Sequence, residues 1–386
     1  MDVLLFYPAI FQKGGGDRVV LELAKRFNAP IYTSIYRRET SYNEFRELDV
    51  REIRSPLFEK PFFFLKKDFV SYALATAGMK FLNYKVREDY DVINAHANPS
   101  NWIRNRNERV CWYFYSPVRG AYDLYKQKVA HLPIHQRALK NAMFSWYKFW
   151  DRRLDPKIEK TVSVSPYVNV RDEKFISEYV RKPVEPIPPG VDHRKFRNEG
   201  YRKYFLYPSR IIPEKRFEYA IEAFREFCSK QKGFKLVIAG FLPYGDREQK
   251  YAQSLRELSK GLDVEFRFNP PDRELKSLYA NSYAVLFSPM NEDWGLVPLE
   301  AMSSEKPCIS VNEGGPTYTI HDGETGFLVN SPQHMAQKML YLAQDPAENE
   351  KLGRAGRKRV LANYTWEIFL SKMEKALREV AKEKSK

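Results

Sequence analysis

Short apolar runs alternate with segments of helical pattern along nearly all of the 386-residue chain. Such alternation is typical of βα units, whose strands pair in parallel sheets, and it excludes all-helical and all-β folds. The predicted strands are Val3–Tyr7, Ala29–Thr33, Asp91–Ala95, Val110–Tyr115 and Thr161–Val164 in the first half, then Tyr204–Tyr207, Lys235–Ala239, Val264–Phe268, Ala284–Phe287 and Pro307–Val311 in the second.

The chain is too long for one ordinary hydrophobic core, which predicts two domains. Residues 182–192 contain four prolines and a glycine, so we expect a stiff connector there. The predicted domains cover residues 1–190 and 191–364. Residues 365–386 form a last helix, capped by Thr365, which we expect to return to the first domain. Because ligands bind outside the carboxyl ends of parallel strands, we expect the two domains to face a central cleft.

Charge and cysteine content narrow the class of protein. Lys plus Arg exceeds Asp plus Glu by 64 − 49 = 15, which favours phosphate-bearing partners without choosing among them. The three cysteines (Cys111, Cys228 and Cys308) give no disulfide framework and favour a reducing compartment. The chain shows no leader peptide and no apolar stretch near the ~18 residues of a spanning helix. We therefore expect a cytoplasmic protein, either soluble or peripheral at the inner face of the cell membrane.

Two carboxylates, Glu292 and Glu300, stand on either side of a glycine and a predicted helix start. Pro298 suits the first turn of that helix, with Glu300 in the same turn and Glu292 in the preceding loop. The exposed N–H groups of a helix N-terminus attract phosphate, whereas the carboxylates would accept hydrogen bonds from hydroxyls. Phosphate with hydroxyls on either side describes a nucleotide-sugar. The alternative is a pair of capping carboxylates without a ligand.

Other polar residues follow predicted strands. Gly14, Gly15 and Gly16 precede a helix and would let a ligand approach the backbone closely; the alternative is a surface turn with Asp17 as the helix cap. Arg210 ends a strand with Lys215 five residues later, and the two can converge on one diphosphate, unless they form only a solvated cluster.

In the first domain His96 follows a predicted strand, and the next strand leads into the polar segment 115–123. The pair Asp89 and Asp91 lies at the opposite end of its strand, so we reject it as a metal site. No other cluster of side chains has metal-ligand spacing.

Taken together, these features resemble the family 4 retaining glycosyltransferases of GT-B fold, in which two Rossmann-like domains face a central cleft. The resemblance is densest from Pro289 to Val329, where Glu292 and Glu300 fit an E-x7-E motif followed by residues 313–316 and 321–329. Ser209-Arg210 through Lys215-Arg216 matches the family's phosphate-binding Arg and Lys, and Gly14–Gly16 matches its glycine-rich loop.

The resemblance implies roles for these residues. Arg210 and Lys215 would hold the donor diphosphate, and Glu300 would bond the ribose. His96 would contact the transferred sugar. The segment 268–275 would lie beside the nucleobase. The implied catalytic residues are His96, Arg210, Lys215 and Glu292, and the implied donor-binding residues are Gly14, Gly15, Gly16, Ser209, Arg210, Lys215, Asn269, Pro270, Glu292, Asp293, Trp294, Gly295, Leu296 and Glu300.

On the acceptor side the resemblance points to Tyr115, Arg119 and Asp123, in a motif of mannosyltransferase-like members. Those members commonly have His where this chain has Tyr115, which weakens any transfer of sugar or acceptor identity. The implied reaction retains anomeric configuration and needs no metal and no cofactor. GDP-mannose is the first candidate donor and UDP-hexoses follow.

The acceptor should meet the first domain, as a glycan or a lipid-linked glycan in glycan biosynthesis. Segments 54–67 and 141–153 mix aromatics with cations, which can rest on an anionic membrane or pack into a core. Two other functions stay open: another nucleotide-sugar enzyme such as an epimerase, and a basic nucleic-acid-binding protein. The second lacks any recognisable readout motif, so we expect no nucleic-acid partner. The sequence does not indicate an oligomeric state.

Overall fold

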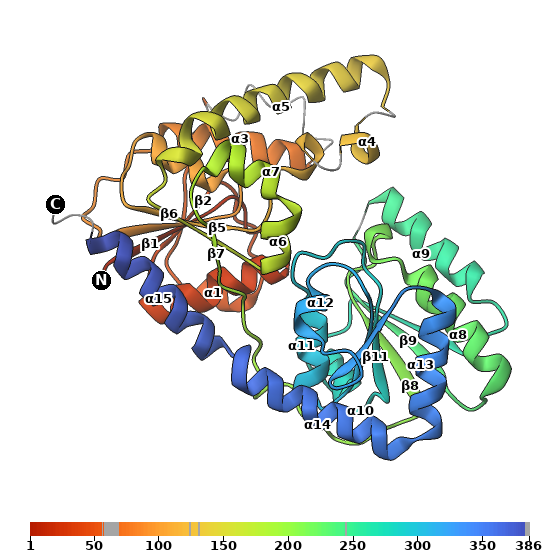
Figure 1. Cartoon of the computed structure of the whole chain (residues 1–386). Coiled ribbons are helices and arrows are strands. Elements are labelled where there is room, and N and C mark those ends of the chain that lie inside the picture. Colours follow the sequence, from red (N-terminus) through yellow and green to blue (C-terminus); the bar gives the residue numbers. More distant parts are fainter. Residues whose placement is uncertain (56, 58–68, 123–124, 130–131, 244, 383–386) are drawn as a thin grey trace. The chain divides into compact units, whose positions relative to one another are not determined.

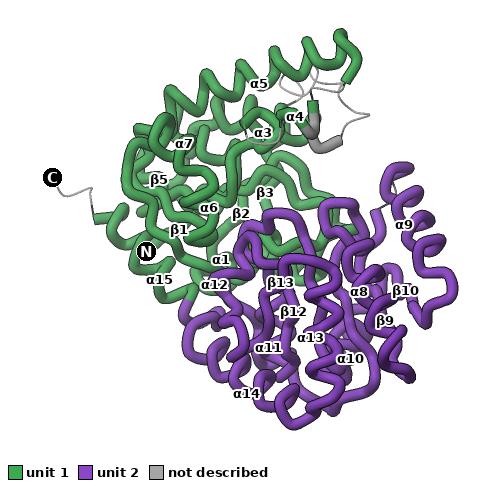
Figure 2. The backbone as a smooth tube through the Cα atoms, turned by 45° about the vertical axis from the view of Figure 1, so that its right-hand side comes forward, with its two compact units in different colours: residues 1–188, 369–386 green, residues 189–368 purple. Residues whose placement is uncertain are grey.

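The computed structural model describes residues 1–55, 57, 69–122, 125–129, 132–243 and 245–382. The chain divides into two compact units, which Figure 2 colours separately. Unit 1 comprises residues 1–188 and 369–386, and unit 2 comprises residues 189–368. Each is an α/β unit with an all-parallel sheet.

The sheet of unit 1 has the strand order β3-β2-β1-β4-β5-β6-β7. Helices α1 and α15 lie on one side of it and α3 and α5 on the other (Figure 1). The strands are β1 (Val3–Tyr7), β2 (Ile31–Thr33), β3 (Val50–Glu52), β4 (Val92–His96), β5 (Val110–Phe114), β6 (Lys160–Ser163) and β7 (Glu185–Pro186). The main helices are α1 (Gly15–Phe27), α3 (Phe69–Asn83), α4 (Tyr125–Lys128), α5 (Ile134–Leu154), α6 (Pro166–Arg171), α7 (Glu173–Phe175) and α15 (Trp366–Lys382), with 3-10 turns η3 (Ser100–Asn105) and η4 (Arg119–Ala121).

The sheet of unit 2 has the order β10-β9-β8-β11-β12-β13, and helices cover both of its faces (Figure 1). Its strands are β8 (Tyr204–Pro208), β9 (Lys235–Gly240), β10 (Val264–Phe268), β11 (Ala284–Phe287), β12 (Cys308–Val311) and β13 (Gly326–Val329). Its helices are α8 (Phe217–Lys230), α9 (Asp246–Leu258), α10 (Asp272–Asn281), α11 (Leu296–Ser303), α12 (Pro316–Thr319), α13 (Pro332–Gln344) and α14 (Pro346–Asn363), with the 3-10 turn η7 (Pro213–Lys215).

Burial explains why these segments form strands and helices. The central strands of unit 2 are apolar runs because helices bury them on both faces, as in Phe205, Leu206 and Tyr207 of β8, whereas the edge strand β10 alternates apolar and charged residues. Helix α8 instead buries one stripe, formed by Phe217, Ala220, Ile221, Phe224 and Phe227, which is the spacing of an amphipathic helix.

Helix α15 supplies a covering surface for unit 1. Its residues 369, 373, 376, 377 and 380 are buried at helical spacing. The ring of Phe369 packs edge-on against Tyr113, and Glu374 and Glu379 pair with Arg26 and Lys160. Thr365 accepts the amide of Ile368 at 3.3 Å, as expected of a helix cap.

The proline-rich stretch contains the division between the two units, and within it Glu185 and Pro186 also pair with β6 as an edge strand, where proline is tolerated. Two expectations about local structure were wrong. The helix after the glycine triplet begins at Gly15, so its N-cap is Gly14 and Asp17 is its third residue. His96 ends strand β4 instead of following it.

Candidate functional site

In unit 2 the strand order reverses between β8 and β11, which are neighbours in the sheet. The connections from these strands leave in opposite directions, so the backbone separates at their carboxyl ends. Two segments meet there: residues 209–216, called here the β8 loop, and residues 288–295, the β11 loop. The amide of Met290 donates to the carbonyl of Glu214 at 2.9 Å, which joins the two loops directly.

Lys215 and Glu292 form the central ion pair of this edge. The ammonium of Lys215 lies 2.6 Å from Oε2 of Glu292, and their side chains are 12% and 26% exposed. The two residues predicted from separate motifs are therefore brought together, as one cation and one carboxylate at the carboxyl edge of the sheet.

Ser209 and Arg210 stand at the end of β8. The backbone of Ser209 packs against Gly240, whose position would place a Cβ 1.8 Å from the Ser209 carbonyl oxygen. Arg210 is exposed, and no ion pair or side-chain hydrogen bond joins it to another residue in the described part of the chain. Its charge is therefore not neutralised by a described carboxylate.

Helix α11 begins directly after the β11 loop. Gly295 is its N-cap with φ +85°, a conformation that favours glycine, and this residue has no side chain with which to cap the first turn. The N–H groups at this end are suited to an anion. Pro298 lies in the first turn as predicted, but Glu300 is the fifth helical residue and was wrongly placed in that turn.

A hydrogen bond from Tyr279 orients the carboxylate of Glu300. The fully buried Tyr279 hydroxyl donates to Oε2 of Glu300 at 2.5 Å. Burial and the Glu300 carboxylate raise the pKa of Tyr279 well above its usual value, so the hydroxyl stays a donor. The partly buried Glu300 carboxylate is thereby fixed in orientation.

Two other predicted donor-binding residues, Trp294 and Asn269, make hydrogen bonds within the protein. Trp294 is buried, donates from Nε1 to the carbonyl of Pro189 at 3.2 Å and packs edge-on against Tyr364. Its side chain is therefore part of the core of unit 2. Its neighbours Asp293 and Leu296 are only half-buried. Asn269, next to Pro270, has φ +55° and accepts the amide of Leu242 at 3.0 Å, which steadies the turn after β9.

In unit 1 the order reverses between β1 and β4. The helix α1 starts here with Gly15 and Gly16, after the N-cap Gly14. A Cβ on Gly16 would lie 2.9 Å from the Tyr7 hydroxyl and 3.7 Å from that of Tyr115. The glycine therefore allows two tyrosine hydroxyls to approach the start of the helix.

His96 is completely buried beneath these groups. Nε2 lies 2.8 Å from Oδ1 of Asn94, whose amide donates to the carbonyl of Cys111, so Nε2 carries the proton. Nδ1 then faces the Tyr115 hydroxyl at 3.4 Å. Desolvation by burial lowers the pKa of His96 to about 3, so the ring is neutral. Tyr115, which is partly exposed, is the group of this pair that reaches the surface.

The segment after β5 is anchored to a buried carboxylate. Arg119 is half-buried in η4, and Asp123 lies outside the described residues. Asp151 accepts from Tyr122 at 2.8 Å and from Trp102 at 2.7 Å. Burial raises the pKa of Asp151 to about 6 in spite of these donors.

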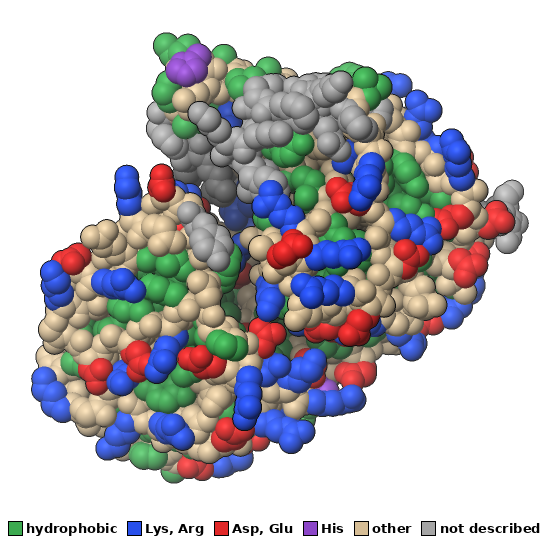
Figure 3. Space-filling view, turned by 180° about the vertical axis from the view of Figure 1, so that it is seen from behind, with side chains coloured by type: hydrophobic (Ala, Val, Ile, Leu, Met, Phe, Trp, Pro, Cys, Tyr) green, Lys and Arg blue, Asp and Glu red, His purple; other side chains and the backbone are tan. Residues whose placement is uncertain are grey.

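Among the described residues, no group of three or more His, Cys, Asp or Glu side chains is placed to hold a metal ion. No described helix combines the length and the apolar character needed to span a bilayer. On the face shown in Figure 3, Lys and Arg are interspersed with Asp and Glu across the surface, without one contiguous basic field.

Comparison with known families identifies the second unit. Residues 191–359 match the family described as "Glycosyl transferases group 1". Unit 2 is a group 1 glycosyl transferase domain. The β8 loop, the β11 loop and the start of α11 all lie within the matched residues.

Curated relatives of this glycosyl transferase domain have different activities. The α-1,3/1,6-mannosyltransferase ALG2 of Homo sapiens is 34% identical over 36% of this chain and 35% of its own length. A trehalose synthase of Pyrococcus horikoshii is 32% identical over 44% and 41%. A probable sucrose-phosphate synthase of Thermosipho melanesiensis is 28% identical over 54% and 49%. The chain thus spans half or less of the length of these relatives.

Solved structures extend the similarity of fold to both units. Sucrose-phosphate synthase from Thermosynechococcus elongatus has a TM-score of 0.73 at 19% identity, over 98% of this chain and 99% of its own. Anabaena HepE in complex with UDP and glucose has a TM-score of 0.70 at 15% identity, over 98% and 100%. At such identities the likeness shows the fold, which is the two-domain GT-B type.

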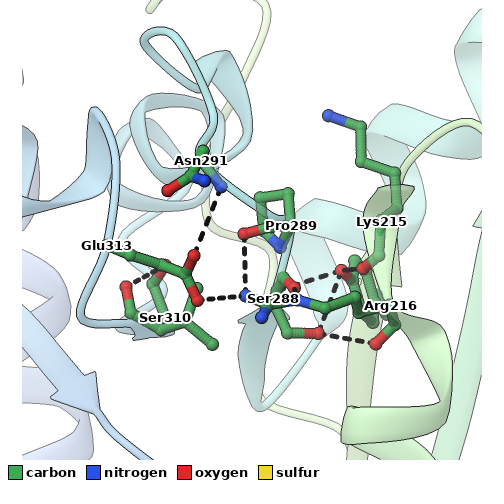
Figure 4. A network of polar contacts seen from close by, with 9 residues as sticks. Lys215, Arg216, Ser288, Pro289, Asn291, Ser310 and Glu313 are labelled. Carbon is green, nitrogen blue, oxygen red and sulfur yellow. Dashed lines mark hydrogen bonds and ion pairs between the residues drawn. The ribbon is translucent and has the colours of Figure 1, made fainter. Parts of the chain in front are cut away.

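Sequence reasoning missed part of the glycosyl transferase domain's polar edge. Figure 4 shows Arg216 and Glu313 at the centre of a network that joins three loops. Arg216 was visible beside Lys215 and Glu313 beside a glycine pair, but neither residue had a role. The signal that could have found them is the pair of glycines Gly314 and Gly315, which require a close backbone approach.

Proposed function

We propose that the chain is a retaining glycosyltransferase. It would move a hexosyl group from a nucleoside diphosphate sugar to a hydroxyl of a glycan or a lipid-linked acceptor. The observation that carries this proposal is the Lys215–Glu292 pair beside the start of α11, at the strand-order reversal of a group 1 glycosyl transferase domain.

The chemistry follows from the charges at that edge. When the bond between the anomeric carbon and the phosphate oxygen breaks, the diphosphate leaves with the electron pair. Lys215, Arg210 and the N–H groups of α11 would stabilise the growing negative charge without rearranging. The acceptor oxygen then bonds to the anomeric carbon from the face that the diphosphate leaves, and its proton passes to a diphosphate oxygen. Glu292 and Glu300 would accept hydrogen bonds from sugar and ribose hydroxyls.

GDP-mannose is the first candidate donor, because ALG2 mannosyltransferases recur among the relatives. UDP-hexoses are the second candidate, since HepE has been crystallised with UDP-glucose. Thermal-shift titration with GDP-, UDP- and ADP-sugars separates them, because a ligand of the native state raises the unfolding temperature by mass action. Assays with and without EDTA test the proposed independence of metal.

The decisive experiment removes Arg210. Arg210→Ala should lower turnover about 10²-fold or more, the scale for losing one preorganised electrostatic donor. Arg202→Ala is the matched control, because Arg202 is equally exposed and precedes β8 instead of following it. A folded Arg210→Ala protein with the turnover of the control would rule out this assignment. Product analysis must detect a new glycosidic bond, because an isomerised donor alone would indicate an epimerase.

The acceptor proposal includes contact with an anionic membrane through α5. This helix carries Arg137, Lys140, Lys148, Arg152 and Arg153, while its one carboxylate, Asp151, is buried. Ile134, Leu139 and Phe149 are exposed on it. A cationic helix with exposed apolar side chains suits the membrane interface on the cytoplasmic side. The other aromatic segment, residues 54–67, lies largely outside the described residues. Co-sedimentation with phosphatidylserine vesicles at low salt tests the contact, and protein left in the supernatant would remove it.

A further inference from the structure

We propose that Arg216 and Glu313 form a positioning clamp, meaning an ion pair that holds the Lys215–Glu292 pair in its working geometry. This inference rests on the proposed function for its effect on catalysis. Neither side chain is assigned a contact with the donor, so both residues would act through the loops that they join.

Arg216 holds the β11 loop by its backbone. Its Nε donates to the carbonyl of Ser288 at 2.7 Å, and a terminal nitrogen donates to that of Pro289 at 3.0 Å (Figure 4). The same guanidinium pairs with the carboxylate of Glu313. Only a planar group with several fixed donors can serve two carbonyls and a carboxylate at once, which the single ammonium of lysine cannot do in this arrangement.

Glu313 brings in a third segment, residues 312–315, called here the β12 loop. Its carboxylate accepts the amide of Asn291 at 3.3 Å. The amide of Gly315 donates to the carbonyl of Glu292 at 2.8 Å. The backbone of Glu292 is therefore packed between its own loop and the β12 loop, and the clamp closes this arrangement.

The backbone of the β8 loop is fixed by the same network. The hydroxyl of Ser288 donates to the carbonyl of Arg216 at 2.9 Å, and the Tyr207 hydroxyl bonds the carbonyl of Lys215. Arg216 itself has φ +49°, a conformation that costs a non-glycine residue free energy and that surrounding contacts must maintain. Because Lys215 and Arg216 are consecutive, a shift of the clamp moves the Lys215 ammonium as well.

The exposure of the pair distinguishes positioning from simple stabilisation. The side chains of Arg216 and Glu313 are 22% and 34% exposed, and ion pairs near the surface contribute little to the free energy of unfolding. Loss of the clamp should therefore reduce turnover far more than it reduces stability.

Arg216→Lys tests the clamp because it keeps the charge and removes the fork. The matched control is Arg225→Lys. Arg225 lies within α8, the helix that Arg216 precedes, and its guanidinium donates to the carbonyl of Leu258, the last residue of α9. Hydrogen exchange should rise in peptides covering residues 288–296 in Arg216→Lys alone. With the donor found by titration, kcat/KM should fall about 10²-fold, the scale for a misplacement near 1 Å. The control should keep wild-type values.

A double-mutant cycle with Lys215→Ala shows whether the clamp acts through the ion pair. If it does, Arg216→Lys should cost little more in the Lys215→Ala background, because the group that it positions is gone. Additive losses, or exchange of residues 288–296 equal to that of the control, would overturn the clamp. Absence of any transfer by the wild-type protein would instead refute the proposed function, and the exchange measurement would still decide whether Arg216 holds the loop.

Discussion

Gly314→Ala, compared with a control glycine of the same backbone conformation, should show how closely the β12 loop packs against Glu292. Gly314 has φ +76°, and a Cβ built on it would lie 2.7 Å from both the N and the O of Glu292. Ordinary contact begins at 3.4 Å, so the backbone of Glu292 must retreat by about 3.4 − 2.7 = 0.7 Å. Adding a methyl group to a packed site costs ~1–3 kcal/mol, besides ~1–2 kcal/mol for the left-handed conformation.

The chain offers a matched control in Gly323. Its φ is +75°, and a Cβ there would meet nothing within 4 Å, so Gly323→Ala adds the strain without the clash. Unfolding temperatures of both variants isolate the packing cost. A displacement of 0.7 Å at Glu292 should also lower kcat/KM by up to about 10²-fold in Gly314→Ala alone. Equal stability and equal turnover in the two variants would refute the close packing of the β12 loop against Glu292.

Three further predictions concern single side chains. His96→Gln should lower activity by the same factor from pH 5 to 9, because a histidine with a pKa near 3 does not titrate in that range; a changed shape of the pH–rate profile would contradict this. Tyr279→Phe should weaken donor binding about tenfold by calorimetry, since a hydrogen bond to a charged group contributes ~1.5–3 kcal/mol and the aromatic ring is kept. Asp151 has its pKa raised to about 6 in the folded protein, so the native state binds more protons than the unfolded state between about pH 4 and 6. Its contribution to the unfolding free energy should therefore fall as pH rises through that window. Denaturation curves of Asp151→Asn should fall less steeply there, and Asp155, whose pKa burial also raises, should account for the dependence that is left.

The regular elements were largely predictable because their signals are local. Strands β1, β10 and β11 were predicted to the residue, since β1 and β11 are apolar runs and β10 alternates apolar and charged residues. The strands that were missed lack such a run. Strand β3 (Val50–Glu52) is mostly polar and exposed at the sheet edge, and β7 contains a proline. Strand β13 follows a turn, and its residues were assigned to the 321–329 motif and not to a strand.

The site was predictable where charge and strand ends coincide, and not where distant loops meet. Lys215 and Glu292 could be named because each follows a strand, and their ion pair joins the two neighbouring strand ends. The contact of Arg216 with Glu313 joins residues 97 apart in sequence, which no spacing rule contains. Burial was equally invisible: the sequence does not show that the ring of His96, expected to contact the transferred sugar, is completely buried and faces the Tyr115 hydroxyl.

The placement of α15 has a consequence for how the chain is synthesised. Residues 369–380 complete the core of unit 1, yet they leave the ribosome after every residue of unit 2. The first sheet therefore keeps exposed the apolar surface awaiting Phe369, Met373 and Leu377 until residues 369–380 are free to pack. A chain cut back to residue 368 should accordingly hold all of unit 2 and a first unit whose core stays open to solvent.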